Sequence, residues 1–122
     1  MIDKKHRVKK HEDFQKIIRS NKVEKNPSFV VYYDNNDDKI VRVGISVSKK
    51  LGNAVIRNNI KRQVRHMFHD LKENLNNIDV IIIVRQNYKN NSFLENEKLL
   101  SRSLEKIRRK ISHSKFGEVF FV

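Results

Sequence analysis

The clearest pattern of hydrophobic and polar positions in the chain is an alternation across residues 39–49. From Val41 onward every second residue is a β-branched aliphatic one as far as Val47, and the residues between are polar, charged or glycine. This two-residue period is typical of a strand that buries one face. The apolar positions are Val41, Val43, Ile45 and Val47, and the positions between them are Arg42, Gly44, Ser46 and Ser48.

Other segments also have the composition of strands. Residues 28–33 are rich in aromatic and β-branched side chains and end at a polar turn over residues 34–38. Because that turn is short, we expect 28–33 and 39–49 to pair as an antiparallel hairpin. Residues 79–84 are almost entirely aliphatic and predict a buried central strand, and residues 22–25 are a candidate for a short edge strand.

Apolar residues at helical spacing predict three helices, over residues 11–20, from Asn53 to about Leu75, and over about 93–111. Asn53 is suited to the N-cap of the middle helix, since its side-chain oxygen can accept from a free backbone N–H. The apolar residues of that helix follow one another at steps of three or four and form one face: Ile56, Ile60, Val64, Met67, Leu71 and Leu75.

These elements predict an α+β fold: a single two-layer domain with the order α-β-β-β-α-β-α and a βαβ crossover through the middle helix. Such crossovers are nearly always right-handed, and the pattern itself does not fix the hand. Residues 1–10 are polar and basic and are expected to form a flexible arm, which leaves residues 11–122 as the domain. Residues 115–122 are apolar, and we expect them to add a strand or to pack on the sheet.

The charge of the chain points to a polyanionic partner. Its 27 Lys and Arg against 14 Asp and Glu give a net charge of +13 over 122 residues, enough to attract nucleic acid, an anionic membrane or an acidic protein. No apolar run is long enough to span a bilayer, and the basic N-terminus is not followed by the apolar segment of a secretory signal. The absence of cysteine excludes a disulfide-linked partner. Nucleic acid, a cytoplasmic location and no membrane are therefore expected.

The positive charge concentrates in one part of the chain. Residues 39–69 contain eight Lys or Arg and no acidic residue. Like charges at i, i+4 on a helix repel each other, so a binding face for a polyanion explains this segment better than an ordinary solvated helix face. The free N–H groups at the start of the middle helix would add a site for phosphate. We predict that the partner is bound by Lys49, Lys50, Asn53, Arg57, Asn58, Lys61, Arg62 and Arg65.

The same residues carry a family resemblance. The segment from Ser46 to Arg65, SVSKKLGNAVIRNNIKRQVR, resembles the signature of the bacterial ribonuclease P protein component. The match extends to a Glu-Asp-Phe-Gln segment at 12–15, an aromatic strand at 29–33 and residues 81–85 after the middle helix, so it covers nearly the whole chain in order. The chain departs from the family at Asn59, where an Arg is usual.

The resemblance implies a function and a fold. In that family an RNA subunit uses Mg²⁺ to hydrolyse precursor tRNA and remove its 5′ leader, while the protein binds the RNA subunit and guides the leader. Catalytic residues and dedicated metal ligands are therefore not expected in this chain. The resemblance also implies that the βαβ crossover is left-handed.

A second surface agrees with a leader groove. The polar positions of strand 39–49 and an aromatic of strand 28–33 share one sheet face, and the first helix could wall it. Aromatic platforms combined with cations bind single strands without sequence preference. For the aromatic residue of the first helix, ordinary core packing is an equally good interpretation. The predicted groove residues are Phe14, Ile18, Tyr32, Arg42 and Ser46.

Two alternatives remain open on the sequence. One is a non-catalytic ribosomal or translation-associated RNA-binding module, and the other is a stand-alone nuclease. The second has little support, because no carboxylate pair stands in a catalytic pattern. His66 and His69 lack the third ligand that a zinc site requires.

Overall fold

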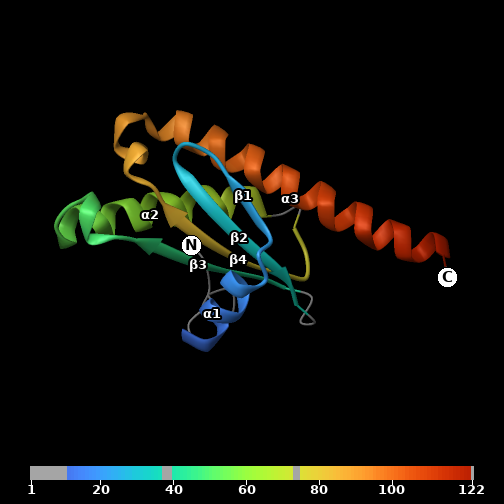
Figure 1. Ribbon diagram of the computed structural model, residues 1–122. Coiled ribbons are helices and arrows are strands. Elements are labelled where there is room, and N and C mark those ends of the chain that lie inside the picture. Colours follow the sequence, from blue (N-terminus) through green and yellow to red (C-terminus); the bar gives the residue numbers. More distant parts are fainter. Residues whose placement is uncertain (1–10, 37–39, 73–74, 122) are drawn as a thin grey trace.

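The computed structural model describes residues 11–36, 40–72 and 75–121, with side chains up to Ile111. The predicted arm, residues 1–10, lies outside the described residues. The order of elements confirms the predicted α-β-β-β-α-β-α succession (Figure 1): α1 (His11–Arg19), β1 (Val23–Lys25), β2 (Phe29–Asn35), β3 (Val41–Val47), the 3-10 turn η2 (Lys49–Leu51), α2 (Ala54–Leu71), β4 (Ile78–Val84), the 3-10 turn η4 (Gln86–Asn90) and α3 (Phe93–Phe121). In the described part of the chain, no helix is apolar over a length that would cross a membrane.

The predicted hairpin between the second and third strands is wrong. The strand order is β1-β2-β4-β3, so β4 lies between β2 and β3. β2 runs antiparallel to β4, and β3 runs parallel to it. The connection from β2 to β3 passes the start of β4 and is tied to it, because Asn36 N donates to Asn77 O at 2.8 Å and Ile78 N donates to Ile40 O at 3.3 Å.

β4 takes the central position because it is apolar on both sides. Val80, Ile81 and Ile82 are all fully buried, although consecutive residues of a strand point to opposite faces. A hairpin of β2 with β3 would have left this strand at an edge, with one row of backbone groups unpaired. The prediction of a buried central strand at 79–84 is confirmed.

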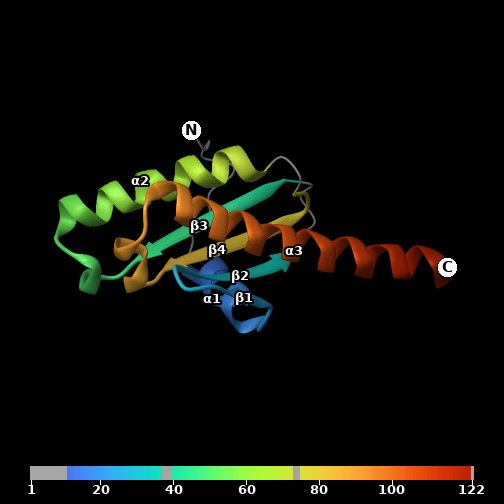
Figure 2. The ribbon, with the colours of Figure 1, turned by 90° about the horizontal axis from the view of Figure 1, so that it is seen from above.

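The helices cover the two faces of the sheet unequally. α2 and α3 lie side by side on one face, and the short α1 lies on the other (Figures 1 and 2). The main core is enclosed between the sheet and the α2–α3 layer, and a smaller cluster around Ile17 and Ile81 lies under α1. The crossover β3–α2–β4 is left-handed (Figure 2), as the resemblance implied.

Two helix ends differ from the prediction. α2 ends at Leu71, and Leu75 is buried in the loop that follows, where it still packs in the main core. α3 continues to Phe121, so residues 115–121 extend the helix and do not add a strand. α3 projects beyond the sheet in both views (Figures 1 and 2).

A polar cluster attaches α3 to the turn between β1 and β2. The Asn26 side chain accepts from the backbone N–H groups of Ser28 and Phe29 at 2.9 and 2.8 Å. Its amide group donates to Leu99 O at 3.2 Å and to Ser103 Oγ at 2.8 Å. One side chain therefore shapes the turn and fixes the helix above it.

α1 packs closely on the sheet because β3 has a glycine beneath it. A Cβ atom added at Gly44 would lie 2.5 Å from Phe14 Cζ, far inside van der Waals contact. The absence of a side chain at Gly44 therefore leaves room for the Phe14 ring to pack against the sheet.

We predict that Gly44→Ala destabilises the protein by about 1–3 kcal/mol, the usual effect of overpacking, because the Phe14 ring must move. In a Phe14→Ala background the same substitution should have almost no effect, since the clash is gone. Urea unfolding of the wild type, both single variants and the double variant measures this coupling. Additive effects would contradict a direct contact between the two residues.

Candidate nucleic-acid interface

The start of α2 combines backbone donors with cations. Asn53 is the N-cap, as predicted, and its side-chain oxygen accepts from Ile56 N at 3.0 Å. Lys49 and Lys50 lie in η2 immediately before the helix and are both exposed. The positive end of the helix dipole and two ammonium groups therefore meet at one place, an arrangement that suits a phosphate group.

Three of the four Lys and Arg residues of α2 lie on the flank of the helix away from the segment that follows β4. The opposite side is marked by Gln63, whose Oε1 accepts from the Tyr88 hydroxyl at 2.7 Å. With about 100° per residue, Arg57, Lys61 and Arg65 lie across the buried stripe from Gln63, toward the free edge of β3. We name the following set the basic face: Lys49, Lys50, Asn53, Arg57, Asn58, Lys61, Arg62 and Arg65.

No described acidic residue neutralises the basic face. The ion pairs among the described residues take their cations from elsewhere, for example from Arg42, Arg108 and Lys110. Neither Lys61 nor Arg62 makes a side-chain hydrogen bond within the described residues. The positive potential of this face is therefore not offset locally.

Arg57 carries an unsatisfied donor. Its Nε is shielded from solvent and has no hydrogen-bond partner among the described residues. An unpaired buried donor costs about 1–3 kcal/mol.

The sheet face under α1 holds the second set of predicted residues. Tyr32 and Gly44 both lie opposite Ile81 in the sheet, and Ser46 lies opposite Ile83 in the next row. Phe14, Ile18 and Tyr32 are half-buried and pack around Ile17 and Ile81. The row with Ser46 is less covered, since Ser46 is exposed and Ile83 only partly buried. We name Phe14, Ile18, Tyr32, Arg42 and Ser46 the α1-side groove.

Arg42 is the one charged residue of the predicted groove, and its charge is already paired within the protein. Its Nε and one terminal nitrogen donate to the two oxygens of Asp79 at 2.7 and 2.6 Å. Asp79 is almost fully buried, and Asp13 of α1 lies 3.9 Å from the same guanidinium. Arg42 therefore joins α1 to the sheet. The alternation of β3 predicted its face but neither of its partners.

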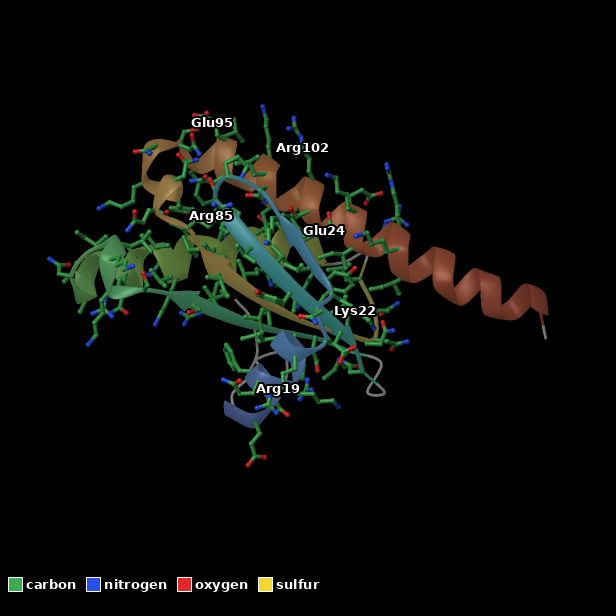
Figure 3. The ribbon with its side chains drawn as sticks, in the orientation of Figure 1. Arg19, Lys22, Glu24, Arg85, Glu95 and Arg102 are labelled. Atoms are coloured by element: carbon green, nitrogen blue, oxygen red, sulfur yellow. The ribbon has the colours of Figure 1, made fainter. Side chains whose placement is uncertain are left out.

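Arg85 is a cation that the sequence argument did not assign to the site. It follows β4 directly, is exposed, and lies beside the turn between β1 and β2. One of its terminal nitrogens donates to Asn26 O at 3.1 Å, and Figure 3 shows its position. Its position directly after the apolar run of β4 was the signal that could have identified it.

The histidines do not assemble into a metal site within the described ranges. His66 Nε2 lies 3.8 Å from Asp70, and no group of three His, Asp or Glu side chains is close enough to hold an ion there.

A small basic α+β domain with an unneutralised helix face has the features of a nucleic-acid-binding protein. The family model for ribonuclease P matches residues 2–108. The ribonuclease P protein components of Mesoplasma florum and Staphylococcus epidermidis are 46% and 47% identical over 97 and 105 residues, which cover 78% and 85% of this chain and 88% and 91% of theirs. The chain therefore belongs to the ribonuclease P protein family.

Solved structures agree with this assignment. The RNase P protein of Staphylococcus aureus superimposes with a TM-score of 0.77 at 43% identity and covers 84% of this chain and 94% of its own. The protein from Thermotoga maritima gives a TM-score of 0.70 at 30% identity, with 79% and 96% covered. Membership of the family makes this chain part of the machinery that processes tRNA.

Proposed function

We propose that this protein is the subunit of a cytoplasmic ribonuclease P that binds the catalytic RNA through the basic face and the 5′ leader of precursor tRNA through the α1-side groove. The observation that carries the proposal is the basic face itself: cations along one side of α2, an open helix N-terminus beside them, and no described acid to neutralise them. Repulsion between these cations opposes folding of the helix, and a polyphosphate partner would relieve it.

The groove supports the second half of the proposal. Tyr32 and Phe14 offer aromatic surface, and Ser46 and Ile83 form a less covered floor beside them. Such a combination suits a single strand whose bases stack and whose backbone is held by charge. Arg42 contributes by fixing α1, through Asp79 and Asp13, more than as a phosphate ligand.

Catalysis belongs, in this proposal, to the RNA subunit. Mg²⁺ would be held by that RNA, and we assign no metal to the described side chains. The protein would contribute affinity and position, because both of its surfaces consist of cations, amides and aromatic rings.

We predict that the purified protein, mixed with a bacterial ribonuclease P RNA, increases cleavage of precursor tRNA at low Mg²⁺ and has no activity alone. Cleavage is expected to increase because the basic face neutralises RNA phosphates that Mg²⁺ would otherwise have to screen. Release of the 5′ leader, followed by gel electrophoresis, measures both arms. RNA-free cleavage that survives stringent purification would favour a stand-alone nuclease, and RNA binding without any gain in cleavage would favour the ribosomal alternative.

Binding of the RNA subunit should weaken steeply with salt, because each phosphate contact releases a counterion and lowers log K by about 0.7–0.9 per log unit of salt. Arg62→Ala should reduce both the affinity and this slope. Arg102→Ala is the matched control: Arg102 is exposed on α3 and extends away from the sheet (Figure 3). A filter-binding titration at several salt concentrations measures the slopes. Equal slopes for wild type and Arg62→Ala would mean that RNA docks elsewhere.

Loss of an aromatic ring from the groove should weaken binding of leader-bearing tRNA to the holoenzyme. Stacking contributes about 1–3 kcal/mol per base, so Tyr32→Ala and Phe14→Ala are expected to lose roughly tenfold in affinity. Mature tRNA, which lacks the leader, should bind as before, and Tyr32→Phe should behave as wild type because it keeps the ring. Since Phe14 also packs on Gly44, thermal unfolding of each variant accompanies the measurement. Folded variants with undiminished preference for leader-bearing tRNA would exclude this groove.

A further inference from the structure

The chain that follows β4 returns along the side of α2 opposite Arg57, Lys61 and Arg65. It contacts α2 and the preceding turn at three levels. Lys89 Nζ donates to Leu51 O at 2.9 Å, and the Tyr88 hydroxyl donates to Gln63 Oε1 at 2.7 Å. At the third level the rings of Phe93 and His66 lie 6.3 Å apart, tilted by 47°. Residues 88–93 therefore flank the exposed side of α2 on the edge opposite Arg57, Lys61 and Arg65, and we call this edge the second border.

The contact of Tyr88 holds the segment firmly against α2. The ring is buried and makes an edge-to-face contact with Phe29 of the sheet, with 5.6 Å between centroids. Burial raises the pKa of Tyr88 to about 12, so the hydroxyl keeps its proton for Gln63. The border consequently has a fixed position relative to the basic face.

Phe93 is held in place and yet accessible. It opens α3, where Ser92 Oγ accepts from Glu95 N at 3.2 Å and Glu95 Oε1 accepts from Ser92 N at 3.1 Å. These reciprocal bonds form a capping box, and they lower the pKa of Glu95. The Phe93 side chain nevertheless remains 39% exposed. An ordered aromatic residue at the surface offers a ready platform for another ring.

The charges around Phe93 indicate how a nucleic acid would approach it. Arg62 lies one helical turn before His66 and belongs to the basic face, so cations adjoin the platform on that side. On the other side Asp70 lies 3.8 Å from His66, which disfavours phosphate. Lys89 is exposed, and its ammonium group is held at the η2 turn beside Lys49 and Lys50.

We propose that Phe93 is a stacking site for an unpaired base of the RNA that binds the basic face, and that Lys89 contacts a phosphate along the same border. This inference rests on the proposed function, since it takes the RNA subunit as the ligand. It extends the RNA contact beyond the predicted residues to the opposite border of α2.

One experiment distinguishes the two parts of the proposal. It measures the affinity of the full-length protein for a bacterial ribonuclease P RNA at several salt concentrations. Phe93→Leu keeps an apolar side chain and removes the ring, so affinity should fall about tenfold while the salt slope stays the same. Phe93→Trp should bind as wild type or tighter. Leu94→Ala is the matched control, because Leu94 is 57% exposed next to Phe93 and has no ring to stack.

Lys89→Gln should lower the salt slope by about 0.7–0.9. Lys98→Gln, the same change at an exposed lysine of α3, should leave the slope unchanged. Thermal unfolding of all variants separates binding from packing. If Phe93→Leu unfolds at a lower temperature but binds RNA as wild type does, the ring only packs on α2 and the stacking site is wrong.

The proposed function can fail separately from this site. A wild-type protein that does not bind the RNA would overturn both. A wild-type protein that binds with an Arg62-dependent slope, while Phe93→Leu and Lys89→Gln are indistinguishable from it, would leave the proposed function intact and overturn the second border.

Discussion

Burial of β4 on both faces is the constraint on which the rest of the architecture depends. Val80 and Ile82 point into the main core and Ile81 into the smaller cluster under α1, and each buried aliphatic side chain stabilises the fold by roughly 1.5–3 kcal/mol. A strand with two apolar faces requires cover on both. The α2–α3 layer covers one face completely. α1 has nine residues, about 13 Å of helix, and covers only part of the other face.

The α1-side groove follows from this unequal cover. The row of Ile81 is closed by Ile17, while the next row, with Ile83 and Ser46, is left partly open. The position of α1 is set by two contacts, the Phe14 ring on Gly44 and the bridge from Asp13 through Arg42 to Asp79. An incompletely covered central strand thus yields both the stability of the sheet and an accessible surface along it.

Charge is segregated in the same way. Several acids of the described chain pair with cations outside α2, as in Glu105 with Arg108, Glu24 with Lys110 and Asp34 with Lys22. None lies on the exposed side of α2 between its start and Asp70. The repulsion that results is tolerated because the other side of α2 is deeply buried through Ile60, Val64, Met67 and Phe68. Burial of its apolar side therefore stabilises α2 against the repulsion between the cations on its exposed side.

The sequence predicted the elements far better than their pairing. Periodicity identified β3, β4 and α2, and the preference of Asn for the N-cap located the start of α2 at Asn53. The pairing of β2 with β3 was predicted wrongly from the short loop between them, because five residues can extend up to about 17 Å. That reach is sufficient for neighbouring strands or for strands separated by a third, about 9.6 Å apart. Likewise, alternation gave the correct face for Arg42 but could not show that Asp79, distant in sequence, lies opposite it in the sheet. The local sequence pattern thus predicts which face of the sheet a side chain lies on, while its contact partner depends on how the strands are ordered in the sheet.

The edge position of β3 links the two surfaces. Its core side chains, Val43 and Val47, lie under α2, and its other face carries Gly44 and Ser46 in the groove. Directly after Val47 the chain enters the turn with Lys49 and Lys50 and then the cap of α2. The basic face and the groove therefore lie on opposite sides of one strand that is hydrogen bonded to β4 along its whole length. The sheet and α2 share a close-packed core, so the spacing between them is set by side-chain packing. An RNA on the basic face and a strand in the groove would consequently be held at a fixed distance by rigid structure, which is the property that a positioning subunit requires.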